Sequence, residues 1–266
     1  MSLLRFDYSD RRLTITLDDP RRQNALSPEM VAEIDRALED SRARGLASVV
    51  IAGANGVFSA GADLKSLAHA LANPPAPGEA DPLRDQNRGG GQFFARLNAH
   101  PGATIALVDG AAVGGGMGLA CCADIVIATQ RARFALAETS LGIPPAQIAP
   151  YLVARLGERH VRRLALTGAR IDGREAAAIG LADYYCETDQ QRDATLATLV
   201  EQIGRCAPGA NAVTKRLIQA SRDGATPAYI EDAARSFAAC LRGPEGREGV
   251  AAFLEKRVPS WAGSRS

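Results

Sequence analysis

The stretch from Ile105 to Gly142, IALVDGAAVGGGMGLACCADIVIATQRARFALAETSLG, carries most of what the sequence says about the fold. It begins with the apolar run Ile105–Val108, which predicts a buried strand, and the glycine run Gly114–Gly116 then leads into residues of helical composition. Two more short strands are expected before Glu138. Because the first amides of a helix lack partners and lie at the positive end of its dipole, this glycine turn predicts a place for a negative charge.

The composition is typical of a globular protein and narrows the function classes. The 31 basic and 30 acidic residues among 266 give a net charge of +1, which lacks the basic excess of nucleic-acid-binding proteins. Five cysteines without CxxC spacing favour a reduced protein in which they serve as small buried apolar residues. The first residues lack a secretory signal pattern, and aspartates and glycines interrupt the longest apolar run. We therefore expect a soluble cytoplasmic protein with neither a nucleic-acid nor a membrane partner.

Strand and helix patterns alternate along the first part of the chain. Residues 4–17 alternate as a hairpin of half-buried strands does, and Ser27 is a helix-capping residue before an apolar-faced helix and a further buried strand. The last part shows amphipathic helical patterns and few strand signals. We therefore expect an α/β core over residues 1–188 and a helical oligomerisation region over residues 189–266.

Two segments are expected to be irregular. Residues 73–88 are rich in proline, glycine and charge, and they predict a long loop that could serve as a lid or an insertion. Residues 143–150 contain three prolines, which enforce an irregular path directly after Glu138.

Common catalytic signatures do not occur. A dinucleotide-binding GxGxxG pattern is broken at Leu119, a nucleophile elbow GxSxG fails at Val57, and no phosphate-binding GxxxxGK[ST] motif is present. His69, His100 and His160 have no metal-ligand spacing. We interpret them as surface or core histidines and expect no metal site.

Two turns rich in glycine and alanine remain, Ser59–Ala62 and Gly114–Gly116, each between a predicted strand and a predicted helix. Small residues often serve only to permit close packing, and for either turn alone that interpretation stays open. Together the turns could place the N–H groups of Ala60 and Gly115 about 3 Å from one oxygen. Such a pair stabilises an enolate or a tetrahedral oxyanion.

Glu138 is the candidate acid–base group. A lone glutamate is usually a solvated surface residue, but Glu138 lies between the apolar segments 134–136 and 141–143. Loss of solvation raises the pKa of a carboxyl group toward the range useful for proton transfer.

Four motifs follow one another along the chain: RQNAL at 22–26, FSAGADL at 58–64, GGGMGLA at 114–120 with Asp124 after it, and FLEKR at 253–257. In this order they resemble the enoyl-CoA hydratase/isomerase, or crotonase, superfamily over nearly the whole chain. The resemblance implies an α/β fold built as a spiral of ββα units with a helical C-terminal region. It also implies homotrimers, which often pair into hexamers.

The resemblance further implies an acyl-CoA thioester substrate and no cofactor beyond the coenzyme A that the substrate carries. By motif position, Ala60 and Gly115 are expected to bind the thioester carbonyl. Phe253 and Lys256 are expected to close over CoA. The resemblance leaves open whether they do so within one subunit or from a neighbouring subunit. The residues expected to line the nucleotide end of CoA are Arg22, Ala25, Ala62, Asp63 and Leu64.

The chain departs from the two-glutamate hydratases of this family at one position. Their first glutamate falls at Gly118 and is missing, whereas their second falls on Glu138. One carboxyl group can move a proton between carbons or act with a water molecule, but it cannot supply both an acid and a separate base. The segment IPPAQIAPY at 143–151 is similar to bacterial hydratases acting on 3-methylglutaconyl-CoA, carboxygeranoyl-CoA and isohexenylglutaconyl-CoA, and RCAPGANAVTK at 205–215 resembles the last of these.

The sequence therefore predicts a lyase that adds water to the α,β-double bond of a branched enoyl-CoA, such as the 3-substituted glutaconyl-CoA isohexenylglutaconyl-CoA. Two alternatives stay open. One is a Δ3,Δ2-enoyl-CoA isomerase, for which a single glutamate suffices. The other is a non-catalytic acyl-CoA-binding homologue, which the missing carboxylate at Gly118 motivates.

Overall fold

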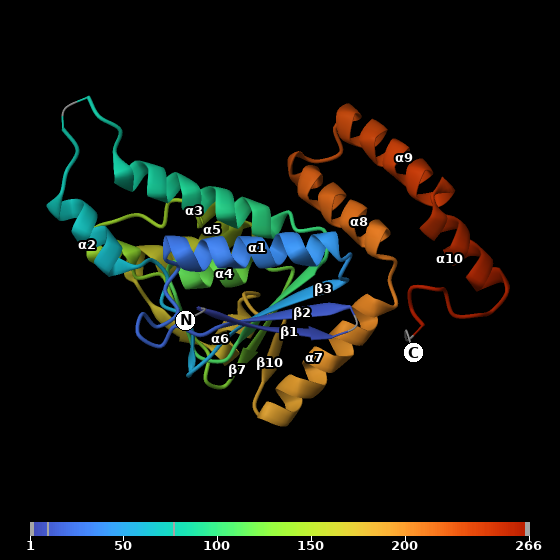
Figure 1. Ribbon diagram of the computed structural model, residues 1–266, viewed down its shortest axis with the longest axis horizontal. Coiled ribbons are helices and arrows are strands. Elements are labelled where there is room, and N and C mark those ends of the chain that lie inside the picture. Colours follow the sequence, from blue (N-terminus) through green and yellow to red (C-terminus); the bar gives the residue numbers. More distant parts are fainter. Residues whose placement is uncertain (1–2, 10, 77, 264–266) are drawn as a thin grey trace.

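The computed structural model describes residues 3–9, 11–76 and 78–263 (Figure 1). Its strands form two sheets, and between residues 48 and 135 successive strands alternate between them, with a helical segment after each pair. This is the spiral of ββα units that the resemblance implies. The α/β class and the helical C-terminal region are both confirmed.

The larger sheet has six strands in the order β1-β2-β3-β5-β7-β10. β1 and β2 form the predicted antiparallel hairpin, with Leu4 opposite Leu17, and the remaining neighbours run parallel. The inner strands are apolar because both faces of a parallel sheet are covered. The six strands are β1 (Leu4–Ser9), β2 (Arg12–Leu17), β3 (Ser48–Gly53), β5 (Ala103–Val108), β7 (Ile125–Thr129) and β10 (Tyr184–Cys186).

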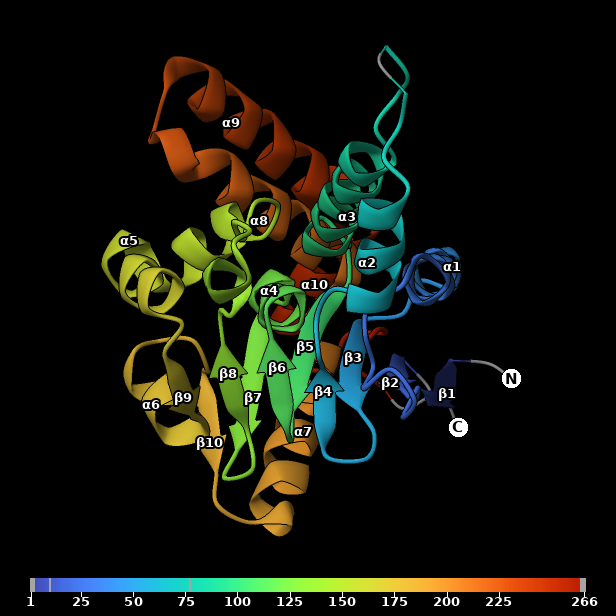
Figure 2. The same cartoon turned by 90° about the vertical axis from the view of Figure 1, so that its left-hand side faces the viewer.

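The smaller sheet has four short strands in the order β4-β6-β8-β9, of which only the last pair is antiparallel. Figure 2 shows these strands side by side, with α4 at the end of β6 and between α3 and α5. The three parallel strands, all but β9, therefore deliver their carboxyl ends to the region around α4. The four strands are β4 (Val57–Ser59), β6 (Ala111–Val113), β8 (Arg133–Ala135) and β9 (Arg170–Asp172).

Ten α-helices and two 3-10 turns follow or cover these strands in the described part of the chain. No described helix is long and apolar enough to cross a bilayer. The helices are α1 (Pro28–Ala43), α2 (Leu64–Ala72), α3 (Pro82–Asn98), α4 (Gly115–Cys122), α5 (Ala149–Thr167), α6 (Gly173–Ala178), α7 (Asp189–Gly204), α8 (Pro208–Ala220), α9 (Pro227–Arg242) and α10 (Pro244–Leu254), and the 3-10 turns are η1 (Glu138–Leu141) and η2 (Ser221–Asp223).

Both faces of the larger sheet are covered. On one face, Leu199 of α7 joins Val50, Ile105 and Ile127 in a buried cluster. The other face packs on the smaller sheet and on α1, α3 and α4 within the main core. Figure 1 shows α7 on one side of the strands and α1 and α4 on the other. The region predicted at 189–266 thus begins with a helix that covers the sheet, while α8, α9 and α10 extend to one side.

The predicted loop at 73–88 is wrong in its second half, because α3 begins at Pro82. Asp81 caps this helix by accepting a hydrogen bond from the Leu83 amide at 2.9 Å, and proline suits a first helical position. The helix then continues through Gly89–Gly91, whose low helix propensity hides it in the sequence. By contrast, the cap of α1 by Ser27 is confirmed.

The histidine and cysteine predictions have mixed outcomes. His100 is buried, and its ring hydrogen-bonds to the carbonyls of Leu38 and Gly102, so it is a core histidine. Cys121, Cys122 and Cys186 are buried as expected, but Cys206 is exposed because it follows the end of α7 on the surface. The described residues contain no group of three or more His, Cys, Asp or Glu side chains that could hold a metal ion.

Candidate functional site

The two predicted turns lie against each other at the beginning of α4. A Cβ atom on Gly61 would lie 2.4 Å from the Val113 carbonyl oxygen and 2.9 Å from the Gly115 nitrogen, and one on Gly115 would lie 3.7 Å from the Ala62 nitrogen. Gly61 also has a φ of +85°, which glycine adopts without strain. Glycine at these positions therefore lets two turns that are far apart in the sequence meet backbone to backbone.

The first amides of α4 lie at this meeting place and have no side-chain capping partner. Gly114 is the N-cap residue, and because it has no side chain it cannot accept a hydrogen bond from them. The first bond of the helix runs from the Gly118 N–H to the Gly114 carbonyl oxygen at 3.0 Å. The Gly115 N–H thus belongs to the group of helix-start amides that a ligand oxygen can use.

The expectation that Ala60 supplies the second donor is wrong. Its N–H donates to the Gln23 carbonyl oxygen at 3.0 Å, and the next amide, that of Gly61, donates to Ser59 Oγ at 3.2 Å. The amide of Ala62 has no acceptor among the described residues, and Ala62 is exposed. The amide available opposite Gly115 is therefore that of Ala62.

The loop at 22–26 holds this turn in place. The Leu26 N–H donates to the Gly61 carbonyl oxygen at 2.7 Å, and Ser59 Oγ donates to the Asn24 carbonyl oxygen at 2.7 Å. Gln23 and Asn24 have φ values of +52° and +55°, which are uncommon for residues other than glycine. The strained backbone of this loop thus orients the Gln23 carbonyl that engages Ala60.

Glu138 lies beside the same helix start. It follows β8 at the first position of η1, and a Cβ atom on Gly114 would lie 2.7 Å from its Oε1. Its Oε2 is buried and has no hydrogen-bond partner among the described residues. Burial raises the pKa of the Glu138 carboxyl group above its ordinary value, as the sequence predicts.

The position of the missing first glutamate is filled by another side chain. A Cβ atom on Gly118 would lie 2.2 Å from Cγ2 and 2.7 Å from Cβ of Ile148, which is itself buried. Any side chain at Gly118 would collide with this isoleucine. Ile148 lies in the proline-containing segment after Glu138, and no pattern in the sequence distinguishes it from its neighbours.

Two of the residues expected at the nucleotide end of CoA are joined beside the turn at Ala62. Arg22 Nη1 lies 3.4 Å from Asp63 Oδ2 and 3.6 Å from Glu29 Oε2, and the Arg22 side chain is 43% exposed. Asp63 also caps α2 by accepting from the Lys65 N–H at 3.1 Å. Leu64 is exposed next to them, whereas Ala25, within the 22–26 loop, is buried.

Phe253 and Lys256 lie elsewhere in the chain. Phe253 is 83% exposed near the end of α10, and Lys256 follows with a φ of +56°. Figure 1 shows α10 at the opposite end of the molecule from α2. One chain alone therefore does not bring these two residues to the turn at Ala62.

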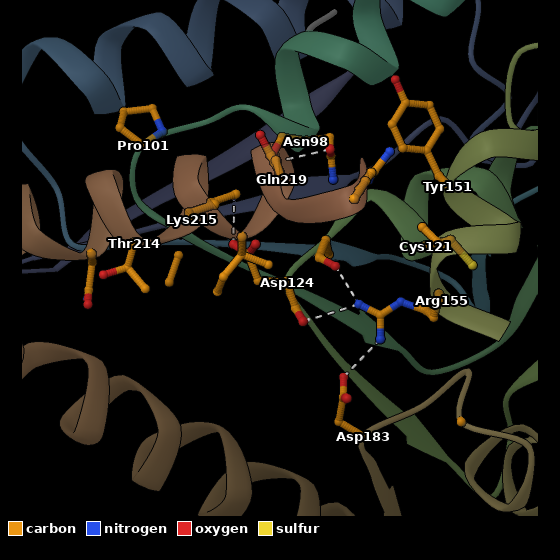
Figure 3. Close-up of a pocket in the computed structure, with 17 residues that line it drawn as sticks. Asn98, Pro101, Cys121, Asp124, Tyr151, Arg155, Asp183, Thr214, Lys215 and Gln219 are labelled. Carbon is orange, nitrogen blue, oxygen red and sulfur yellow. Dashed lines mark hydrogen bonds and ion pairs between the residues drawn. The ribbon is translucent and has the colours of Figure 1, made fainter. Parts of the chain in front are cut away.

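A cavity of about 510 Å³ lies at the far end of α4 and is lined in part by α5 and α8 (Figure 3). Its charged groups pair with one another, with Lys215 Nζ 2.8 Å from Asp124 Oδ2 and Arg155 Nη1 3.1 Å from Asp183 Oδ2. Neither Glu138 nor the glycine turns line it. These ion pairs join α8 and α5 to the core, and the candidate catalytic groups lie at the other end of α4.

Known proteins are similar to this chain over nearly its whole length. The sequence model described as enoyl-CoA hydratase/isomerase matches residues 11–264. The 2,3-dehydroadipyl-CoA hydratase of Escherichia coli is 31% identical over 265 residues, which cover 99% of this chain and 100% of that protein.

Solved structures agree with that match. A crystal structure of an enoyl-CoA hydratase/isomerase from Marinobacter aquaeolei has a TM-score of 0.93 and 40% identity, covering 98% of this chain and 99% of that one. Pseudomonas aeruginosa AtuE has a TM-score of 0.92 and 44% identity, with 98% and 100% covered. The ordered motifs, the fold and these comparisons together show that the chain belongs to the enoyl-CoA hydratase/isomerase family.

Proposed function

We propose that this protein adds water across the α,β-double bond of an enoyl-CoA thioester, with Glu138 as its single acid–base side chain. The observation that carries the proposal is the place of its carboxylate. Oε1 of Glu138 lies beside Gly114. The next residue, Gly115, has a free helix-start amide, and the free amide of Ala62 lies opposite Gly115. A proton-transfer group and two oxyanion donors thus share one small region.

The two amides would hold the thioester oxygen. Addition of a nucleophile to the double bond turns this oxygen into an enolate oxygen, so negative charge develops there during the reaction. Backbone N–H groups of Ala62 and Gly115 are fixed by the surrounding structure and need no reorganisation to meet that charge. Loss of one such donor typically costs about 3 kcal/mol of transition-state stabilisation.

Glu138 would act first as a base and then as an acid. Its ionised carboxylate accepts a proton from water while the water oxygen bonds to C3, and the electrons of the double bond move into the enolate. The protonated carboxyl group then returns the proton to C2, which restores the thioester. The sequence of steps consumes one water molecule and needs no second carboxyl group.

For the acyl group we propose a branched, 3-substituted glutaconyl-CoA, with isohexenylglutaconyl-CoA as an example. The segments at 143–151 and 205–215 support this choice through their similarity to hydratases for such substrates. The Escherichia coli relative is named for 2,3-dehydroadipyl-CoA, a thioester with a second carboxyl group. A comparison of kcat/KM for crotonyl-CoA and 3-methylglutaconyl-CoA tests the preference for a branched dicarboxylic acyl group.

For the assembly we propose a homotrimer or a pair of trimers. The extended arm formed by α8, α9 and α10 exposes several large apolar side chains, which need cover in water. Phe253 and Lys256 on this arm would reach CoA only from a neighbouring subunit. The exposed side chains are Ile218, Ile230, Phe237, Leu241, Val250, Phe253 and Leu254. Light scattering after size exclusion tests this, and a monomer at micromolar concentration would contradict it.

One observation favours a second candidate, a Δ3,Δ2-enoyl-CoA isomerase. Ile148 fills the space next to Gly118, so the described site has one carboxylate, and moving a proton from C2 to C4 needs no more than one. Incubation with a 2-enoyl-CoA and, separately, with a 3-enoyl-CoA distinguishes the reactions. Formation of a 3-hydroxyacyl-CoA supports hydration, whereas a 2-enoyl product without any hydroxyacyl product shows that the protein is an isomerase.

A further inference from the structure

Two adjacent residues of one loop each pack against a glycine, on two different helices, and fill the space that a side chain would take there. A Cβ atom on Gly118 of α4 would lie 2.2 Å from Ile148 Cγ2, and a Cβ atom on Gly91 of α3 would lie 2.2 Å from Gln147 Oε1. We call residues 143–148 the wedge loop, because they fill the space between α3 and α4 through these contacts. An alanine at Gly118 would require Ile148 to shift, and one at Gly91 would require the Gln147 side chain to move.

The wedge loop is fixed at both ends. At its beginning, the Ile143 N–H donates to the Glu138 carbonyl oxygen at 3.1 Å, directly after Gly142 in a left-handed conformation. Toward its end, Gln147 Nε2 donates to Asn87 Oδ1 of α3 at 2.8 Å. The loop therefore starts from the turn that carries the proposed acid–base group and is tied to the neighbouring helix.

Ile148 is the next side chain beyond the Glu138 carboxylate along α4. The carboxylate packs against Gly114 and the isoleucine against Gly118, and these two positions are one hydrogen-bonded turn apart. Gly114 is the N-cap of the helix, and four residues of helix span about 6 Å along the axis. Ile148 is therefore close enough to the Glu138 carboxylate to contact an acyl group whose reacting carbons lie beside Glu138.

The size of Ile148 matters because its side chain is buried and closely packed. The side chain is 3% exposed and presses on backbone at Gly118 rather than on a flexible side chain. Tightly packed interiors respond to a change of one methylene group. A wall of this kind can therefore discriminate between acyl groups that differ by one or two carbon atoms.

We propose that Ile148 is a specificity-determining residue whose side chain limits the size of the substituent at C3 of the acyl group. The inference rests on the proposed function, since it uses the placement of the thioester oxygen at Ala62 and Gly115 and of the reacting carbons at Glu138. In this proposal the wedge loop selects the acyl group, whereas Glu138 transfers the proton.

The test compares the wild type with Ile148→Ala and Ile148→Phe. The substrates are crotonyl-CoA and 2-enoyl-CoA thioesters with progressively larger 3-substituents, and the readout is the ratio of kcat/KM for the larger over the smaller acyl group. We expect Ile148→Ala to raise this ratio about tenfold and Ile148→Phe to lower it by a similar factor. A ratio within about twofold of wild type in both variants would overturn the proposal.

Two additions keep the outcome clear. Val153→Ala, on the exposed side of the first turns of α5, is the matched control and should leave the ratio unchanged. Ile148→Val, which removes one methyl group, replaces Ile148→Ala if that variant does not fold, with a smaller shift in the same direction.

Binding separates this proposal from the proposed reaction. Dissociation constants of the saturated thioesters butyryl-CoA and 3-methylbutyryl-CoA, measured by calorimetry, require no turnover. If the wild type hydrates no enoyl-CoA, the proposed function fails, and a changed ratio of these two dissociation constants in Ile148→Ala still supports the role of Ile148. An unchanged ratio overturns that role whether or not the enzyme turns over.

Discussion

The carboxylate of Glu138 packs directly on the backbone of Gly114, so closely that a Cβ atom there would lie 2.7 Å from Oε1 and 3.2 Å from Cδ. The contact joins the end of β8 to the beginning of α4, and a backbone hydrogen bond of 2.8 Å from Gly114 to Ala135 fixes the two segments in register. Glycine at this position is therefore part of the geometry that places the acid–base group.

Gly114→Ala should inactivate the enzyme without unfolding it. The added methyl group would push the Glu138 carboxylate out of its position, and a displacement of about 1 Å in a reacting group can cost about 10²-fold in rate. We expect kcat to fall by at least this factor with KM little changed, as measured with crotonyl-CoA or a better substrate.

Gly45→Ala is a control for the effect of a positive φ. Gly45 has a φ of +63°, and a Cβ atom on Gly45 would meet nothing within 4 Å. Because the ψ of Gly114 is −119°, outside the left-handed region open to alanine, Gly45→Ala should lose less Tm than Gly114→Ala and should keep full activity. Equal activity losses in the two variants would mean that strain, and not the contact with Glu138, is responsible.

Glu138→Gln should abolish turnover while leaving CoA binding intact. Removal of a positioned acid–base group typically lowers the rate by about 10²–10⁴-fold, and the amide cannot accept or return the proton. Single-turnover rates and the dissociation constant of butyryl-CoA measure the two effects. If the variant and the wild type show the same trace rate on every acyl-CoA, the chain is an acyl-CoA-binding protein without catalysis.

The same variant should be more stable than wild type at neutral pH. Burial raises the pKa of Glu138 in the folded protein above its ordinary value of 4.5, so the folded state binds this proton more tightly than the unfolded state. The free energy of unfolding that this proton contributes to the wild type is fully present below the unfolded pKa and is lost as the pH rises through the folded pKa. The Tm of Glu138→Gln minus the Tm of wild type should therefore grow by a few degrees as the pH is raised from about 4 to about 8. A constant difference in Tm over this range would contradict the raised pKa.

The meeting of the two turns could be predicted from the sequence, whereas the identity of one donor could not. Both turns consist of small residues between a strand and a helix, a pattern that motif order alone reveals. The Gln23 carbonyl decides which amide of Ser59–Ala62 stays free, because it accepts the hydrogen bond from Ala60. Gln23 has a left-handed backbone conformation although it is not glycine, and this conformation orients its carbonyl. No local pattern predicts such a contact, so the prediction of Ala60 is wrong and Ala62 is the available donor.

The helical parts show the same limit of local patterns. Strong signals such as Ser27 before Pro28 predicted α1 correctly, because capping is a local interaction. The beginning of α3 at Pro82 was missed because its glycines lower helix propensity, although Gly91 is needed for close packing against Gln147. The space taken by Ile148 at Gly118 is likewise visible only once both segments are placed in three dimensions.

Arg22→Ala should weaken the binding of CoA thioesters with little effect on kcat. The Arg22 guanidinium is held by Asp63 and Glu29 beside the turn at Ala62 and is still 43% exposed, so it can reach a phosphate group. We expect KM and the dissociation constant to rise by about tenfold, that is by about 1.4 kcal/mol of binding free energy. Arg21→Ala, the exposed neighbour, is the control, and equal effects of the two variants would remove the specific role of Arg22.

Gly118→Ala should destabilise the protein, and Ile148→Gly should partly restore it. The alanine methyl group would overlap with Ile148, and overpacking of this kind costs about 1–3 kcal/mol. Because the glycine at 148 removes both colliding atoms, the double variant should lose less stability than the sum of the two single variants. Gly89→Ala in α3 is the control for a helical glycine with open space around it, and it should be neutral or stabilising by up to about 1 kcal/mol. Thermal unfolding at one fixed protein concentration measures all four variants, and strict additivity between Gly118→Ala and Ile148→Gly would show that the two side chains do not share the space assigned to them.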